Sequence, residues 1–269
     1  MPEHRFFVSP EELAVAAASP VPGGIVPITG PEHHHLQRVL RLRKGDEVGL
    51  FDGAGHGFLG VIESIHKEES LVRLTSRDQR TVEPACRLML AQGIPHHDKM
   101  DLIIQKATEI GVWSILPIVG ERTTVSAGSE GSWKRIDRWR RVARDAARQS
   151  GRLRVPEIHE PVAWSRYDER AAAGGDRCLY ILSPGGDRSA PRAQTPAPRD
   201  SLAVIAVGPE GGWTDEEIAM ARGRGFSEVW LGPRVLRTET AGIVAVALLL
   251  FLAGDLGGAA LPRTFPGEG

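Results

Sequence analysis

Two glycine-rich segments in the C-terminal half of the sequence have the composition of ligand-binding loops. The first, residues 208–213, reads Gly-Pro-Glu-Gly-Gly-Trp and directly follows the apolar run Leu202–Val207. The second, residues 231–241, reads Leu-Gly-Pro-Arg-Val-Leu-Arg-Thr-Glu-Thr-Ala and leads into the most apolar stretch of the chain. Glycines let backbone groups approach a ligand closely, so both segments are candidate binding loops at the carboxyl ends of strands.

Neither segment has the glycine spacing of a nucleotide-binding motif. No Gly-Lys-Ser or Gly-Lys-Thr follows the first one, which disfavours a phosphate-binding loop. One match to the dinucleotide fingerprint occurs at residues 55–60, but it lies between β-like segments and opens no helix, so we interpret it as a coincidence. Both segments could also be plain strand-to-helix turns, because Thr214 and Glu217 have capping-box spacing and Thr238 and Glu239 could begin a capped helix.

A helix rich in basic residues is predicted over residues 132–149. Between Lys134 and Arg154 there are nine basic residues and two aspartates. This charge density suits the neutralisation of nucleic-acid phosphates, and the alternative is a solvated cationic face without a partner. Helical spacing predicts a basic face of Lys134, Arg138, Arg141, Arg148 and Arg152 and a buried face of Trp133, Ile136, Trp139, Ala143 and Ala146.

Two kinds of pattern along the chain predict two domains. Short β-like runs joined by tight turns occupy residues 48–74 and are typical of a small barrel. From residue 84 onward, strand-like and helical runs alternate, which is typical of an α/β domain with a mostly parallel sheet. We therefore predict a barrel domain over residues 1–78, an α/β domain over residues 84–254 and a flexible tail over residues 255–269.

The elements of these domains follow from hydrophobic periodicity. In the barrel domain, residues 31–43 are expected to form a helix with Leu36, Val39 and Leu40 on one face. Residues 184–201, rich in Pro, Gly, Ala and Arg, are expected to form a surface insertion. In the α/β domain we predict strands at residues 88–91, 112–119, 178–182, 202–207 and 229–231, and helices at residues 98–110, 132–149, from 214, and 242–254.

The composition excludes several classes of protein. With 269 residues, 41% hydrophobic residues, and 33 Lys+Arg against 34 Asp+Glu, the chain is neither disordered nor fibrous. The polar N-terminus and the distant Cys86 and Cys178 predict a cytoplasmic protein without disulfides. The apolar run at residues 242–254 is shorter than the roughly 20 residues of a membrane span. The adjacent histidines 33–35 face different directions on a helix, so we predict no metal site.

The two glycine-rich segments, in this order, resemble those of the bacterial 16S ribosomal RNA uridine-N3 methyltransferase family, which belongs to the SPOUT superfamily. The resemblance covers nearly the whole chain, and the two C-terminal motifs are highly specific to it. The insertion at residues 184–201 and the tail are the main departures. Further matching segments are Arg5–Val8, His34–Arg43, Lys99–Gly111, Arg122 and Ala146–Arg152.

The resemblance implies a fold and a set of partners. The expected fold is a small PUA-like RNA-binding β-barrel followed by a SPOUT-type α/β methyltransferase domain with a deep C-terminal trefoil knot. The expected cofactor is S-adenosyl-L-methionine, held by the knot loops, in a homodimer with active sites at the subunit interface. The expected substrate is 16S rRNA within the 30S subunit. By position, the cofactor-binding residues would be Gly208, Pro209, Glu210, Gly211, Gly212, Leu231, Gly232, Leu236 and Thr238.

The implied reaction, methyl transfer to uridine N3, sets requirements for the remaining residues. The N3 proton must leave, and the base must be aligned with the sulfonium methyl group. Arg148 or Arg237 could stabilise the developing negative charge, and Glu210 or Glu239 could lie near the sulfonium cation. The sequence names no general base. The expected RNA-binding residues are Arg5, Arg41, Arg43, Arg122, Arg148 and Arg152.

Two other functions remain open at this point. One is a SPOUT enzyme with another RNA target or position, including ribose 2′-O-methylation. The other is a catalytically silent RNA-binding chaperone of ribosome assembly. The intact glycine-rich segments argue against the second, because a silent binder has no need of S-adenosylmethionine.

Overall fold

The computed structural model describes residues 4–18, 23–80, 82–123, 131–167, 177–183 and 202–257. Its backbone contacts divide the chain into two units. Unit 1 consists of Met1–Glu83 and Ala143–Pro156, and unit 2 of Pro84–Val142 and Glu157–Gly269. The contacts thus group the segment 143–156 with the N-terminal unit, which the linear pattern did not predict. The predicted boundaries at residues 78, 84 and 254 stay predictions.

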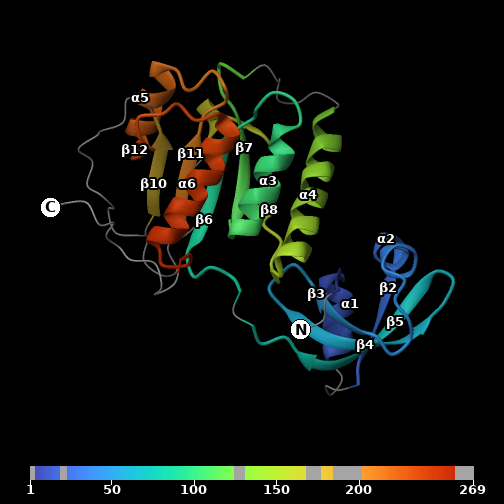
Figure 1. The fold of residues 1–269 in the computed structure, drawn as a ribbon. Coiled ribbons are helices and arrows are strands. Elements are labelled where there is room, and N and C mark those ends of the chain that lie inside the picture. Colours follow the sequence, from blue (N-terminus) through green and yellow to red (C-terminus); the bar gives the residue numbers. More distant parts are fainter. Residues whose placement is uncertain are drawn as a thin grey trace. The chain divides into compact units, whose positions relative to one another are not determined.

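Unit 1 contains a curled five-stranded sheet (Figure 1). Its strand order is β1–β3–β4–β5–β2, antiparallel except for the parallel pair β1 and β3. Phe6, Val48, Ile62 and Val72 are fully buried in its core. The strands are β1 (Arg5–Phe7), β2 (Ile25–Thr29), β3 (Glu47–Phe51), β4 (Gly57–Ile65) and β5 (Glu69–Arg77). The short strands predicted over residues 48–74 are confirmed, and residues 55–60 open no helix.

The helical part of unit 1 differs from its prediction. The first helix, α1 (Pro10–Ala17), is capped by Ser9, whose hydroxyl accepts a hydrogen bond from the Glu12 amide. The second, α2 (Gly30–His34), continues as a π-helical turn that ends at Val39, so the predicted helix over residues 31–43 is wrong at its end. A π-helical turn rotates later residues away from the α-helical register. Leu36 is therefore fully buried, whereas Val39 is 59% exposed.

Unit 2 is built on a parallel sheet, as predicted (Figure 1). The strand order is β12–β10–β11–β6–β7–β8, and β9 also pairs with β7. The last strand of the chain, β12, ends at Val229, two residues before the predicted end. The strands are β6 (Arg87–Gly93), β7 (Ser114–Val119), β8 (Glu157–Ile158), β9 (Val162–Ala163), β10 (Arg177–Leu182), β11 (Leu202–Val207) and β12 (Ser227–Val229).

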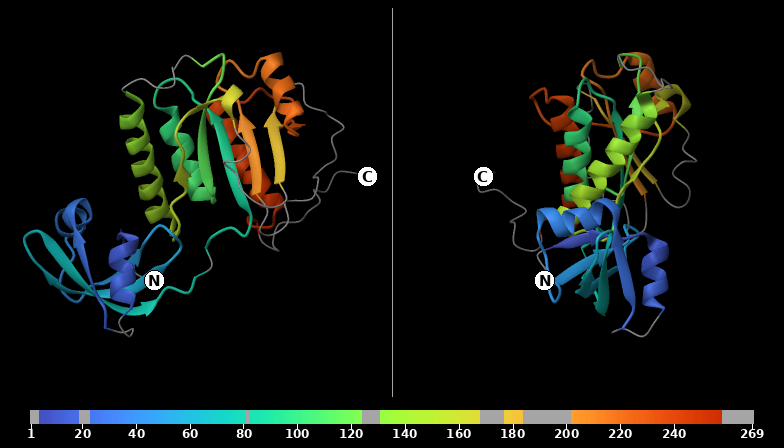
Figure 2. Two further views of the ribbon diagram at one scale, coloured as in Figure 1. Left: turned by 180° about the vertical axis from the view of Figure 1, so that it is seen from behind. Right: turned by 90° about the vertical axis from the view of Figure 1, so that its right-hand side faces the viewer.

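Helices cover the sheet of unit 2. The helices α3 (Lys99–Ile110) and α6 (Thr238–Leu252) lie side by side, and α6 packs on β6 and β11 (Figures 1 and 2). Met89 and Ala91 of β6 belong to a buried cluster with Trp213 and Ala221, the latter from α5 (Asp215–Gly223). Alternate residues of a strand point to opposite faces, so apolar β6 residues in succession predict a strand buried on both faces.

The basic helix α4 spans Gly131–Ser150 and ends at Gly151, whose φ of 82° favours glycine. Ile136, Trp139, Ala143 and Ala146 are buried, as predicted. The side chains of residues 131–134, including Trp133 and Lys134 of the predicted faces, lie outside the described part. The predicted insertion at residues 184–201 also lies outside it.

The C-terminal end of α6 is anchored. Asp255 accepts hydrogen bonds from the amides of Ala85 (3.0 Å) and Cys86 (3.4 Å) at the start of β6. Asp255, the first residue of the predicted tail, thus satisfies two backbone donors, and the flexible tail over residues 255–269 stays a prediction. Residues 258–269 lie outside the described part. Among the helices that the structure describes, none is long and apolar enough to cross a membrane.

Candidate functional site

The start of α6 joins the two glycine-rich segments. Although β12 is the edge strand, α6 packs against β6 and β11 at the middle of the sheet, so residues 230–237 carry the chain back from the edge. The Thr238 hydroxyl donates a hydrogen bond to the Gly208 carbonyl oxygen at 2.5 Å. It also accepts one at 2.9 Å from Nε2 of Gln92, the fully buried side chain near the end of β6.

This geometry corrects the predicted role of Thr238. The N-cap of α6 is Arg237, which makes no side-chain capping bond, and Thr238 is the first helical residue. Its hydroxyl bonds to two other segments of the chain. Thr238 is only 5% exposed, so the hydroxyl must find its hydrogen-bond partners inside the protein. Gln92 was missed by the sequence analysis. A polar residue near the end of an otherwise apolar strand was the available signal.

The loop at residues 208–213 is shaped by close backbone packing. The Gly212 amide donates to the Pro209 oxygen at 2.9 Å, and Gly212 has a φ of 67°. A Cβ atom on Gly93, the last residue of β6, would lie 2.4 Å from the Pro209 nitrogen. Only glycine therefore lets the end of β6 approach this loop so closely. Gly93 was also missed, because a glycine at a strand end is common.

The far end of the loop is held by α5 and by Arg122. The predicted capping box is present, since the Thr214 hydroxyl accepts from the Glu217 amide and Glu217 accepts from the Thr214 amide. The Arg122 guanidinium donates to the carbonyl oxygens of Gly211 (2.7 Å) and Trp213 (3.4 Å). Arg122, predicted to bind RNA, thus contacts the glycine loop directly.

Glu210, predicted to lie beside the cofactor, is hydrogen-bonded to the segment that connects β6 and α3. Both of its carboxylate oxygens accept from the His96 amide, Oε1 at 3.0 Å and Oε2 at 3.2 Å, and Oε1 also accepts from Lys99 Nζ at 3.0 Å. Burial raises the pKa of Glu210, but hydrogen bonds from its own amide, Lys99 and His96 outweigh it and lower the pKa. Glu210 therefore holds the 208–213 loop against the segment between β6 and α3.

Glu239 lies next to the same ammonium group. Its Oε2 is 3.5 Å from Lys99 Nζ, and the Glu239 side chain is only 12% exposed. This buried oxygen receives no hydrogen bond in the described part of the chain. The hydrogen bond to Glu210 and the charge of Glu239 help raise the pKa of Lys99. The ammonium group of Lys99 is thus shared by two carboxylates, one from each glycine-rich segment.

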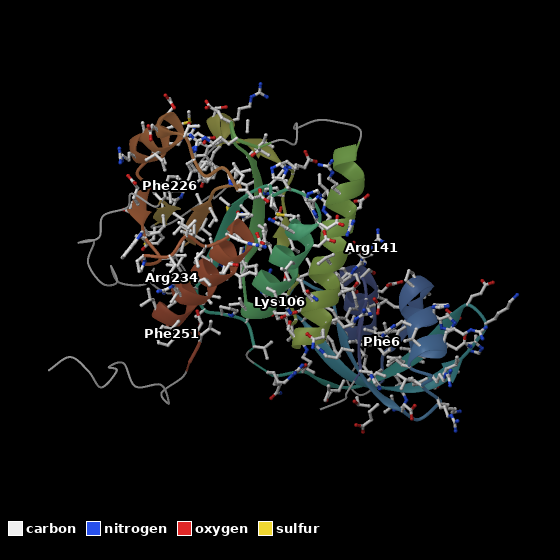
Figure 3. All side chains as sticks on the ribbon, turned by 45° about the horizontal axis from the view of Figure 1, so that its top comes forward. Phe6, Lys106, Arg141, Phe226, Arg234 and Phe251 are labelled. Carbon is white, nitrogen blue, oxygen red and sulfur yellow. The ribbon has the colours of Figure 1, made fainter. Side chains whose placement is uncertain are left out.

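The second glycine-rich segment presents an exposed tip between two half-buried leucines. Leu231 and Leu236 are partly covered, and Gly232 has a φ of 105°. Val235 is 95% exposed, and Arg234, labelled in Figure 3, is also exposed. Arg237, predicted to act in catalysis, is exposed at the start of α6. The residues predicted for the cofactor site therefore gather in two neighbouring loops joined through Thr238.

Two of the predicted RNA-binding arginines are buried in unit 1. The Arg152 guanidinium bonds Glu83 Oε2 at 2.7 Å and is 4% exposed. The Arg5 guanidinium donates to the Arg152 carbonyl oxygen at 3.0 Å, and burial with the nearby charge of Arg80 lowers the pKa of Arg5 to about 10. The prediction that Arg152 shares an exposed basic face is wrong, because Arg152 follows α4 and serves an internal ion pair.

The other predicted basic residues of unit 1 are more accessible. Arg41 and Arg43 are exposed, and Arg41 has a φ of 53° in the turn after the π-helical segment. Arg148 is 22% exposed and bonds Glu32 and Asp145 at 3.2 and 2.9 Å. Arg148 is thus partly neutralised.

Comparison with known proteins assigns the family. Residues 82–250 match the model of the RNA methyltransferase domain family. The chain belongs to this family. Residues 28–75 of this RNA methyltransferase also match an RNA methyltransferase PUA domain. The family resemblance predicted from the two glycine-rich segments is confirmed, and so is the fold class of a SPOUT-type α/β domain preceded by a PUA-like domain.

Individual relatives agree with this assignment. A curated protein of Synechocystis named "Ribosomal RNA small subunit methyltransferase E" is 33% identical, over 91% of this chain and 76% of its own length. A solved structure with the same name from Neisseria gonorrhoeae, bound to S-adenosyl methionine, is 30% identical, with a TM-score of 0.80 over 94% of this chain and 98% of its own. A Legionella pneumophila structure in complex with the cofactor SAM is 31% identical, with a TM-score of 0.78 over 93% and 97% of the two chains.

Proposed function

We propose that this RNA methyltransferase transfers the methyl group of S-adenosyl-L-methionine to N3 of a uridine near the decoding centre of 16S rRNA in the small ribosomal subunit. The observation that carries the proposal is the hydrogen bond between Thr238 and Gly208, which holds two glycine-rich loops together at the carboxyl end of a parallel sheet. Ligands of open α/β sheets bind at this end. The names and bound cofactor of the solved relatives support its coarser part, methyl transfer that uses S-adenosylmethionine, and the name of the first supports ribosomal RNA of the small subunit as the substrate.

The residues present fit S-adenosylmethionine. The cofactor carries a sulfonium cation, and the buried Oε2 of Glu239 makes no hydrogen bond in the described residues and lies 3.5 Å from the Lys99 ammonium, a cation that Glu210 shares. The half-buried Leu231 and Leu236 would exclude water, and the loop backbones would bind the polar groups. When bound, the cofactor supplies an activated methyl group. We propose as its ligands Gly208, Pro209, Gly211, Gly212, Leu231, Gly232, Leu236 and Thr238, with Glu210 fixing the loop.

The chain's own residues would align the base and favour its anionic form. Uridine N3 must lose a proton before it attacks, and negative charge then spreads to the neighbouring oxygens. The exposed guanidinium of Arg237, next to the proposed cofactor loops, would stabilise that charge, and Arg148 is the alternative. Because N3 lies on the pairing edge, the target uridine must be unpaired or extruded before reaction.

RNA binding is assigned to the accessible arginines. We propose that Arg41 and Arg43 of the PUA-like unit contact RNA phosphates, together with Arg122 and Arg148. Arg5 and Arg152 are not included, because their guanidinium groups are engaged inside unit 1. The six positions predicted from the sequence therefore reduce to four.

We also propose that the active form is a homodimer. Apolar side chains remain exposed near the C-terminal end of α6, where Figure 3 labels Phe251. Large exposed apolar patches mark interaction surfaces. A second copy of the chain would cover these side chains, which are Leu248 (44% exposed), Phe251 (39%) and Leu252 (41%).

The deciding experiment is nucleoside analysis by mass spectrometry. Purified 30S subunits from cells that lack this protein are incubated with the enzyme and S-adenosylmethionine, and the 16S rRNA is digested. We expect 3-methyluridine. The Gly211→Asp variant is the control, because a side chain there would meet Arg122 at 2.9 Å and add an anion to the cofactor loop.

The other outcomes separate the alternatives. A different methylated nucleoside, such as a 2′-O-methylated one, would show that the protein is a methyltransferase but that its target is not uridine N3. No product with 30S subunits, together with no measurable affinity for S-adenosylmethionine, would favour an RNA-binding assembly factor without catalysis.

A further inference from the structure

A pocket next to the cofactor loops lies between α4 and the segment that connects β6 to α3. It has a volume of about 260 Å³. Its floor contains the buried side chains of Met100 and Trp139, 1% and 5% exposed. Pockets for drug-sized ligands span about 300–1,000 Å³, so this one suits a smaller group such as a single nucleotide.

Hydrogen bonds connect the wall of the pocket to the proposed cofactor loop. Its wall at residues 94–98 includes the backbone next to His96, whose amide is bonded to Glu210. Lys99, which follows this wall, is bonded to the same carboxylate. None of the residues that line the pocket belongs to the two glycine-rich loops. A methyl donor and an RNA nucleotide could therefore occupy neighbouring, separate sites.

The polar groups of the pocket match the edge of a nucleobase. Arg138 supplies N–H donors, and Asp101, bonded to it at 2.6 Å, supplies acceptor oxygens. A base edge carries both kinds of group, whereas a bare phosphate would be repelled by the carboxylates. Arg135 lines the same pocket and is exposed at the N-terminal part of α4, where it can meet the phosphate of that nucleotide.

His97 provides a stacking surface and carries an unusual backbone. It is exposed, it lines the pocket, and its φ is 58°, one of two positive φ values outside glycine in the described residues. Positive φ is uncommon outside glycine, and histidine is one of the residues that adopt it most often. Unpaired RNA bases commonly stack on histidine and arginine side chains. The exposed ring of His97 is available for such stacking, which glycine could not provide.

We propose that this pocket is the subsite for one unpaired nucleotide of the RNA substrate, with its base against Trp139 and His97 and its phosphate on Arg135. The inference rests on the proposed function, since it takes RNA to be the substrate. It adds an RNA contact on unit 2 that is separate from the arginines of the PUA-like unit.

The test compares two pairs of variants in the full chain. Arg135→Ala is matched by Arg140→Ala, which removes an exposed arginine of α4 that does not line the pocket. His97→Gly is matched by His96→Ala, which removes the neighbouring ring and keeps the amide bonded to Glu210. The probe is a fluorescent single-stranded RNA of mixed sequence with one central uridine, titrated at several salt concentrations. Affinity for S-adenosylmethionine is measured in parallel by calorimetry.

We expect Arg135→Ala and His97→Gly each to weaken RNA binding about fivefold or more, and each control less than about twofold. Arg135→Ala should also lower the salt slope by about one ion. The free energy of unfolding of His97→Gly should equal or exceed that of the wild type, because glycine accepts this φ. If His97 had only a structural role, the variant would lose no affinity for RNA. S-adenosylmethionine affinity should not change.

Two results would overturn the subsite. Equal effects of each variant and its control would reduce the pocket to part of a diffuse basic surface. A loss of S-adenosylmethionine affinity in either pocket variant would assign the pocket to the cofactor instead. Wild-type activity on 30S subunits, measured alongside, separates this failure from that of the proposed function: methylation by an enzyme whose pocket variants match their controls would refute the subsite alone.

Discussion

The hydroxyl of Thr238 donates a hydrogen bond to the backbone oxygen of Gly208, thirty residues earlier in the chain. With the bond from Gln92 to the same hydroxyl, it joins the ends of β6 and β11 to the start of α6. All three segments converge where the proposed cofactor loops begin. Loop shape and local stability are therefore coupled through a single buried side chain.

Replacing Thr238 by valine tests this coupling. Valine keeps the shape but leaves the Gly208 oxygen and the Gln92 amide without their partner, which should cost about 1–3 kcal/mol of unfolding free energy. S-adenosylmethionine affinity should fall as well, because both loops lose a common anchor. Urea unfolding and calorimetry measure the two effects. Thr238→Ser keeps the hydroxyl and should stay close to the wild type; a serine variant as damaged as valine would point to the methyl group instead.

Gly93 sets the distance between β6 and the 208–213 loop. Gly93→Ala would place a carbon 2.4 Å from the Pro209 nitrogen, so the loop must move and cofactor binding should be lost. Gly223→Ala is the matched control, because a Cβ there meets nothing within 4 Å. Calorimetric titration with S-adenosylmethionine distinguishes the two variants. Normal binding by Gly93→Ala would place the cofactor elsewhere.

The carboxylate of Glu210 predicts a dependence of stability on pH. Its hydrogen bonds with its own amide, Lys99 and His96 lower its pKa despite burial. The stabilising contribution is therefore complete above the ordinary pKa of 4.5 and is lost as the pH falls through the lower, folded-state value. The unfolding free energies of wild type and Glu210→Gln should differ near neutral pH and converge in acid. A difference that persists in acid would exclude ionisation as its cause.

Arg152 should matter for stability more than for RNA affinity. Arg152→Ala leaves the Glu83 carboxylate without its guanidinium partner, and breaking a buried ion pair in this way costs about 3–5 kcal/mol. Glu83 still accepts from the amides of Leu153 and Arg154, so the loss should lie at the lower end. Urea unfolding measures it. The salt slope of RNA binding should stay at the wild-type value. A slope reduced by about one ion would instead show that Arg152 contacts an RNA phosphate.

The exposed apolar side chains near the C-terminal end of α6 predict the oligomeric state. Leu248→Asp puts a charge into the apolar patch and should convert a dimer into a monomer in light scattering. The matched control is Val15→Asp, which changes an exposed apolar residue (75%) on α1 of the other unit. If both variants keep the wild-type mass, the patch does not form the dimer.

The sequence by itself determined the local structure and the family. The apolar runs of β6 and β11, the capping box at Thr214 and the glycine stop at Gly111 are short-range signals, and each appears in the structure where it was predicted. The two glycine-rich segments identified the family because their residues are consecutive. The α-helical periodicity placed Val39 on the wrong face, because the chain forms a π-helical turn after α2.

Tertiary structure alone decided which residues work together. Thr238 reads as a helix cap and Arg152 as part of a basic helix, because sequence spacing reports only neighbours along one element. Their partners, Gly208 and Gln92 for one and Glu83 for the other, come from distant segments. Burial removes water as a partner, so the fold selects which polar groups must satisfy each other. That selection depends on the path of the chain in space, and no spacing rule contains it.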